Sequence, residues 1–130
     1  MQHHVELILM KQVASYLVMP VFIVDPDGTL LYYNEPAEEI LGSRYDESGE
    51  MPIEVWSAVF TPTDDDDAPL PLDALPLVEA TTHGRPAHGT FWITGLDGVR
   101  RHIAATAFPL LGHGGHNLGS VAVFWEDGTA

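Results

Sequence analysis

Histidines and carboxylates are the side chains in this sequence that could carry chemistry, because the chain contains no cysteine. That absence removes disulfides, thiolate nucleophiles and thiolate metal ligands together. His113 and His116 lie in a glycine-rich hairpin and could touch one metal ion, but a structural zinc site needs further ligands. His102 falls in a predicted strand, where we expect it to face solvent, and His83 closes a predicted helix. We therefore predict no metal site.

Four adjacent carboxylates, Asp64 to Asp67, form the densest acidic run of the chain. Calcium loops interleave their acidic ligands with turn-forming residues, and that alternation is absent here. The run lies among prolines between Thr61 and Pro71, which disfavour helix and strand. An exposed, solvated acidic loop is the expected structure.

The sequence contains no arrangement of residues that is typical of a catalytic site. No nucleophile has a neighbouring base, no glycine loop could cradle a phosphate, and the acid and base candidates fall mainly in predicted loops. Five basic residues against nineteen acidic ones give a net charge of −14, which repels phosphate backbones and anionic lipids. We expect a protein without catalytic residues that binds neither nucleic acid nor membrane.

The elements that position these residues begin with the stretch from Val21 to Gly42, which predicts strand, turn, strand and helix. Pro26 and Gly28 favour a turn, so the two strands should pair antiparallel. Asn34 is the predicted cap of the helix, and Gly42 supplies its C-terminal stop.

Val5 to Val18 have the spacing of an amphipathic helix that ends near Pro20. Glu6, Lys11 and Pro20 argue against a membrane span, and the first residues lack the basic start of a secretory signal. Cytoplasmic residence is the expected location. The helix packs either on its own domain or on a second copy; the face for a homodimer comprises Leu9, Met10, Val13 and Leu17.

Two further helices and three strands complete the chain. Pro52 to Phe60 predicts a helix that buries Trp56 and Phe60. Leu72 to Gly84 predicts another, with Asp73 as its cap and a Leu72–Leu77 staple. Strands are expected at 88–94, 100–109 and 118–126. Both faces of the last strand are apolar, so the N-terminal helix should cover the outer face of the sheet.

In this order of elements the chain resembles the PAS domain family. The first part of the resemblance is carried by Val24, Asp25, Gly28, Leu30, Tyr32, Asn34, Ala37, Ile40, Leu41 and Gly42. The later part is carried by the segment Leu70 to Leu77 and by Asp97, Gly98, Pro109, Leu110 and Gly119. The resemblance covers residues 20–127, preceded by the helical segment 1–19 and followed by the tail 128–130. After Asp127, Gly128 and Thr129 replace the Ile and Thr of a frequent family linker, which leaves the output route open.

The resemblance implies an α+β fold with a five-stranded antiparallel sheet, short helices on one face and a small pocket beneath them. It implies a sensory or signalling domain that binds a small ligand or a protein, including an effector, and has no enzymatic activity. We expect the pocket to be lined by Phe22, Tyr32, Ile40, Trp56, Phe60, Leu77, Thr81, Phe91 and Ile103.

Some PAS branches attach flavin or another chromophore through cysteine, which this chain lacks. Others bind haem through a histidine on the long helix, the place of His83. We expect no haem, because a histidine in the last turn is already favoured by the helix dipole. Two alternatives stay open: a small cone-shaped isomerase or dehydratase with long helices ahead of most strands, and a dimerisation scaffold without ligand.

Overall fold

The computed structural model describes residues 5–45 and 49–127. The tail 128–130, the first four residues and part of the polar connection after Gly42 lie outside the described residues. A single antiparallel sheet with strand order β2-β1-β5-β4-β3 organises the rest. Its strands are β1 (Val21–Val24), β2 (Leu30–Tyr33), β3 (Ala87–Thr94), β4 (Arg100–Leu111) and β5 (Asn117–Glu126). The predicted five-stranded antiparallel sheet is confirmed.

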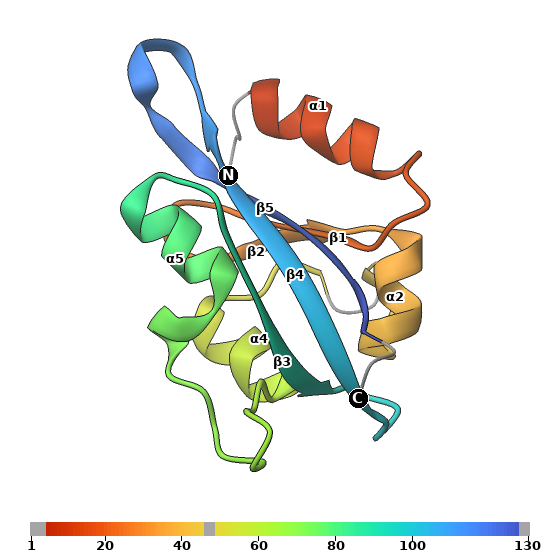
Figure 1. The fold of residues 1–130 in the computed structure, drawn as a ribbon. Helices are drawn as coiled ribbons and strands as arrows, with labels where there is room; N and C mark the ends of the chain where they lie inside the picture. The colour runs from red at the N-terminus through yellow and green to blue at the C-terminus, as the bar shows by residue number, and fades with distance from the viewer. Residues whose placement is uncertain (1–4, 46–48, 128–130) are drawn as a thin grey trace.

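Helices cover both faces of this sheet. One α-helix, α1, lies on one side, and α4 and α5 lie on the other (Figure 1). The helical elements are α1 (Val5–Ala14), α2 (Glu35–Leu41), α4 (Ile53–Phe60), η1 (Leu72–Ala74), α5 (Pro76–His83) and η2 (His113–Gly115). A hairpin therefore precedes α2, α4 and α5, which is the element order of the PAS resemblance. It is not that of the cone-shaped enzymes.

The β1–β2 turn forms as the sequence predicts. The Asp25 carboxylate accepts hydrogen bonds from the backbone amides of Asp27 at 2.9 Å and Thr29 at 3.0 Å. Gly28 takes φ +85°, a conformation that costs glycine little. The turn is thus fixed by its own residues.

Asn34 caps α2, as predicted, and also joins three segments. Its side-chain oxygen accepts from the amide of Ala37 at 3.2 Å and from that of Val21 at 2.9 Å. Its side-chain nitrogen donates to the carbonyls of Ala14 at 2.9 Å and Met19 at 2.8 Å. With an exposed fraction of 0%, this side chain ties the end of α1 to β1 and α2.

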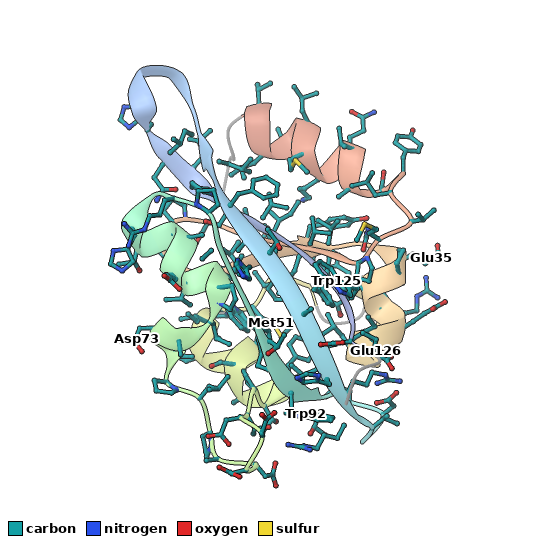
Figure 2. The ribbon with its side chains drawn as sticks, viewed as in Figure 1. Glu35, Met51, Asp73, Trp92, Trp125 and Glu126 are labelled. Atoms are coloured by element: carbon teal, nitrogen blue, oxygen red, sulfur yellow. The ribbon has the colours of Figure 1, made fainter. Side chains whose placement is uncertain are left out.

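The predicted cap of the long helix is wrong. Asp73 lies within η1, and α5 begins two residues after that turn, with Leu75 at the cap position and no capping side chain. Pro76 occupies the first turn, and Leu75 is extended at ψ 132°, as a residue before proline prefers. Figure 2 shows Asp73 at the periphery. Leu72 is exposed, so the predicted staple to Leu77 is also wrong.

The N-terminal helix is shorter than predicted and uses another face for its own domain. It ends at Ala14 rather than near Pro20. Leu7 and Ala14 are buried and Met10 is half-buried against the outer face of the sheet, over Val21, Ile23 and Val121. The prediction that this helix covers the outer face is confirmed.

Two apolar clusters separate the faces of the sheet. The one beneath α1 is small, whereas the one on the opposite face contains Phe22, Trp56, Phe60, Leu77 and Phe124. Alternate residues of β5 enter different clusters, as the period of two in a strand requires. The larger cluster encloses the candidate site.

Candidate functional site

An apolar cavity of about 70 Å³ lies between the sheet and the helices α4 and α5. Its walls come from the strands β1, β3, β4 and β5 and from both helices, so distant parts of the chain must fold before it exists. The lining residues are Phe22, Leu41, Trp56, Phe60, Pro62, Leu75, Pro76, Leu77, Phe91, Ile93, Ile103, Ala105, Ala122 and Phe124.

Aromatic rings fix one wall of this cavity. Phe22 on β1 meets Trp56 edge-on, with ring centroids 5.3 Å apart, and Phe60 edge-on at 6.4 Å. Such T-shaped contacts align the positive edge of one ring with the negative face of another. The two helical aromatics follow the i, i+4 spacing that the sequence shows. Small residues, Ala105 and Ala122, leave the space opposite them.

The cavity offers no polar anchor. Every lining side chain is apolar except that of Trp56, whose indole N–H donates to the Gly28 carbonyl at 2.8 Å and is therefore already paired. A buried polar ligand group would lose its hydrogen bonds to water without replacement, at a cost of roughly 1–3 kcal/mol. The site is therefore suited to bind apolar groups.

Six of the nine predicted pocket residues surround this cavity: Phe22, Trp56, Phe60, Leu77, Phe91 and Ile103. Ile40 is buried in the same cluster, but its neighbour Leu41 lines the space instead. Thr81 faces a second cavity and lies 2.7 Å from the Ser120 hydroxyl. The sequence analysis missed Ile93, Ala105, Ala122 and Phe124 as lining residues. The alternation of side chains along β3, β4 and β5 could have predicted them, because every second residue of a strand faces the same side.

Tyr32 lies on the opposite face of the sheet. The β1–β2 pairing shifts between Ile23 and Val24, so Leu30 faces the cavity side whereas Tyr32 packs beneath α1. Burial, followed by the nearby charges of Glu38 and Glu35, raises the pKa of the Tyr32 phenol. Its inclusion in the predicted pocket is therefore corrected.

The histidines lie apart from the cavity. His83 and His116 are exposed, whereas His102 is half-buried, which corrects its predicted exposure to solvent. The His102 Nδ1 atom lies 3.6 Å from the Asp127 carboxylate. Within the described residues, no three histidine or acidic side chains gather closely enough to hold a metal ion.

The acidic loop is exposed at Asp65 to Asp67, as predicted, and it is also tied to the sheet. Asp64 accepts from the amides of Asp66 and Ala68. The Trp92 indole donates to Asp65 at 2.9 Å, and Arg100 lies 3.6 Å from Asp67 and over the Trp92 ring. These contacts give the carboxylates of Asp64, Asp65 and Asp67 partners within the chain.

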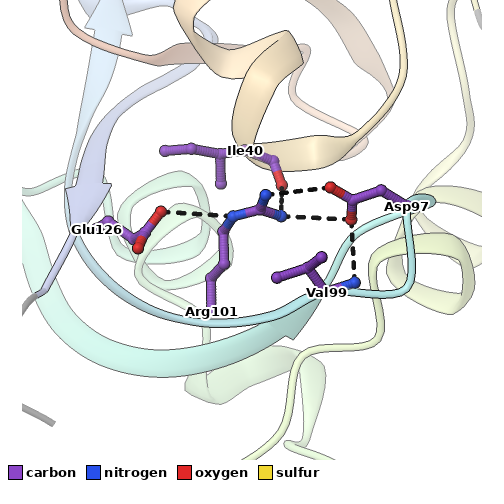
Figure 3. Close-up of polar contacts among 5 residues, drawn as sticks. All are labelled: Ile40, Asp97, Val99, Arg101 and Glu126. Atoms are coloured by element: carbon purple, nitrogen blue, oxygen red, sulfur yellow. Dashed lines mark hydrogen bonds and ion pairs between the residues drawn. The ribbon is translucent and has the colours of Figure 1, made fainter.

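Arg101 joins the β3–β4 turn to the end of α2 (Figure 3). Its guanidinium donates to the Ile40 carbonyl at 3.0 Å and to both oxygens of Asp97, and it lies 3.4 Å from Glu126. Gly95 permits this approach, because a Cβ there would lie 2.9 Å from the Leu41 carbonyl. Arg101 thus fixes the helix that borders the cavity.

This contact should make stability depend on pH. The hydrogen bond from Arg101, followed by that from the Val99 amide, lowers the pKa of Asp97. Its stabilisation is present above the ordinary carboxyl pKa near 4 and is lost as pH falls through the lowered folded-state pKa. Asp97→Asn should therefore be less stable than wild type at pH 7, and the difference should shrink below about pH 4.

Urea unfolding between pH 3 and pH 7 measures this difference. In the Arg101→Gln background, Asp97→Asn should change little, because the partner is already gone. If the difference in unfolding free energy between wild type and Asp97→Asn stays the same at every pH, Arg101 does not act through this carboxylate.

Comparisons with known proteins agree with this architecture. A family model described as PAS domain matches residues 18–130. None of the curated proteins compared with the sequence matches it. Similar solved structures include the PAS domain of a protein from Colwellia psychrerythraea (TM-score 0.67, 13% identity, covering 95% of this chain and 98% of that one).

Two other solved structures are also similar. The PAS domain of BvgS from Bordetella pertussis has TM-score 0.63 and 16% identity, covering 94% of this chain and 85% of that one. The LOV protein of Rhodobacter sphaeroides has TM-score 0.75 and 12% identity, covering 97% of this chain and 70% of that one. At these identities the likeness extends to the fold alone.

Proposed function

Because this chain belongs to the PAS domain family, we propose that it is a regulatory sensor domain whose ligand is a small, largely apolar molecule bound between the sheet and α4 and α5. PAS domains are generally sensory and signalling modules. The observation that carries the proposal is the apolar cavity, since ligand pockets are concave and mostly apolar. A domain without ligand that acts only as a scaffold is the alternative.

Flavin does not fit this cavity, although some similar structures are LOV proteins and one is described with a flavin analogue. The walls of the cavity carry no unpaired hydrogen-bonding side chain that could pair with the polar groups of the flavin ring. The chain also lacks cysteine. Haem is equally disfavoured, because the side chain of His83 is exposed and is not among the lining residues.

The same lining supports a non-catalytic role, which we also propose. General acid–base and nucleophilic catalysis need a polar group within hydrogen-bonding distance of the reacting atom. The cavity presents carbon atoms and a paired indole, and the half-buried His102 lies on the other face of the sheet. We therefore propose binding without turnover.

Native mass spectrometry of the protein as purified tests the ligand proposal. We expect a population that carries one small molecule, released on denaturation and identifiable as largely apolar. Protein recovered empty from several hosts and growth conditions would instead support a scaffold.

We also propose that residues 1–19 act as a docking segment for a homodimer, appended to the PAS domain of residues 20–127. Leu9, Val13 and Leu17 are 53%, 51% and 40% exposed, and Val5 and Ile8 lie beside them. Adjacent exposed apolar side chains of this size favour burial against a partner. Met10 faces the domain itself, so it contributes to the support of α1 rather than to the centre of the interface.

A second copy is the simplest partner, because one apolar patch can serve both subunits of an isologous interface. An effector protein with an apolar groove is the other candidate. In the homodimer, the exposed faces of two α1 helices pack on each other while each helix keeps its inner face on its own sheet. Each buried aliphatic side chain stabilises by roughly 1.5–3 kcal/mol before the costs of association.

Val13→Glu combined with Leu17→Glu should convert the dimer to a monomer. Light scattering over a dilution series measures the mass. The matched control is Leu96→Glu with Val99→Glu, which adds the same charge at exposed apolar residues of the β3–β4 turn and should leave the dimer intact. A wild type that stays monomeric at high concentration would reject the homodimer.

A further inference from the structure

A second cavity of about 130 Å³ adjoins the first. It lies between the β1–β2 turn, the start of α4 and the outer turns of α5. Trp56 and Leu77 line both cavities, so these two side chains form the partition between them. The remaining lining residues of the second cavity are Val24, Pro26, Asp27, Gly28, Ile53, Val78, Thr81 and Thr82.

The volumes indicate that neither cavity alone can hold an aromatic ligand. About 70 Å³ and about 130 Å³ are each below the roughly 150 Å³ that accommodates one benzene molecule, whereas the two together exceed it. An aromatic ligand therefore requires both spaces, and the partition has to open to join them.

The two halves of the partition are held differently. Trp56 is fixed by its hydrogen bond to the Gly28 carbonyl and by its edge-on contact with Phe22. Leu77 lies in the first turn of α5, which begins without a capping side chain. A change of side-chain rotamer at Leu77 breaks no hydrogen bond, so Leu77 is the less constrained half of the partition.

The second cavity differs from the first in its polar groups. Asp27 and Thr82 are exposed residues among its lining, whereas the Thr81 hydroxyl is already bonded to the Leu77 carbonyl and to Ser120. An aspartate on a protein of net charge −14 repels anions and attracts cations. The polar end of a ligand here is thus neutral or positive.

We infer that the two cavities form one binding site for a small aromatic molecule with a neutral or cationic polar group. The ring spans both cavities across the opened partition, its polar group lies beside Asp27 and Thr82, and Leu77 is the gate. This inference rests on the proposed sensor function and specifies its ligand class.

Calorimetric titration with indole, tryptamine and indole-3-acetate tests the inference. These probes share one ring system and differ in charge. We expect tryptamine to bind about tenfold more tightly than indole-3-acetate, and Asp27→Asn to narrow that ratio to about twofold. Equal affinity for the cation and the anion, or absence of binding by all three, would overturn the inference.

Cavity-filling variants locate the probe. Thr82→Trp fills the second cavity from an exposed position and should weaken tryptamine binding about tenfold or more. Ala105→Leu fills the first cavity and should do the same, with the smaller Ala122→Val as a second variant. Circular dichroism confirms that each variant is folded.

The outcomes separate this inference from the proposed function. If Thr82→Trp leaves tryptamine affinity unchanged while Ala105→Leu abolishes it, the apolar cavity is the whole site: the sensor proposal stands and the joined site is wrong. If an apolar molecule co-purifies but no indole binds, the sensor proposal also stands and the ligand class is wrong.

Discussion

Gly119→Ala is expected to cost most or all of the stability of the fold. A Cβ at this position would lie 2.0 Å from the Val24 carbonyl oxygen and 3.0 Å from the Asp25 Cα. Both are backbone atoms of the neighbouring strand and turn, so relief requires separation of β5 from β1. The backbone at Gly119 also has φ +126°, a conformation that residues other than glycine rarely adopt. We expect a loss above about 4 kcal/mol, close to the net stability of a domain of this size.

Gly98→Ala is the matched control. This glycine also has a positive φ, +78°, but a Cβ there meets nothing within 4 Å. It should cost only the conformational penalty of about 1–2 kcal/mol. Urea unfolding of the two variants measures the difference, and equal losses would mean that the approach of β5 to Val24 does not constrain this residue.

Asn34→Ala should give the next largest effect. The substitution leaves the buried amides of Val21 and Ala37 and the carbonyl of Met19 without the side chain that pairs them. The Ala14 carbonyl also loses Asn34 but keeps its hydrogen bond from the Leu17 amide. Each buried polar group left unpaired costs roughly 1–3 kcal/mol, and water entering the gap offsets part of the sum. We expect a net loss of about 3–5 kcal/mol.

Asn34→Asp distinguishes the two halves of this contact. Aspartate keeps an acceptor for Val21 and Ala37 but cannot donate to Ala14 and Met19. Limited proteolysis of the residue 14–20 segment should accelerate in both variants, since both release α1 from the sheet. If Asn34→Ala unfolds at the same urea concentration as wild type, Asn34 does not stabilise the contact of α1 with β1 and α2.

Predictions from the sequence succeeded where the determining interactions are local. The turn at Asp25 to Gly28, the cap at Asn34 and the stops at Gly42 and Gly84 each depend on residues within one turn of each other. Alternation of apolar residues located the three long strands within a few residues. The arrangement of the sheet then followed from the order of the elements.

The errors have longer-range causes. The irregular pairing near Val24 places Tyr32 on the outer face, and no residue type signals that shift. Pro76 begins α5, so Leu75 holds the cap position and Asp73, a good capping residue, lies before it in η1. The α1 helix ends at Ala14, whose carbonyl accepts from Asn34, twenty residues later. The cavity itself combines residues from seven helices and strands, so its size could not be read from spacing.

The apolar cavity beneath α4 and α5 is the place where we propose that the ligand binds. Native mass spectrometry of wild type and Ala105→Leu, expressed and purified side by side, tests this proposal most directly, because the added side chain fills the cavity of about 70 Å³. We predict a bound small molecule in wild type that is absent from the folded variant. The same added mass on both proteins would contradict the proposal, since the molecule would then be bound elsewhere.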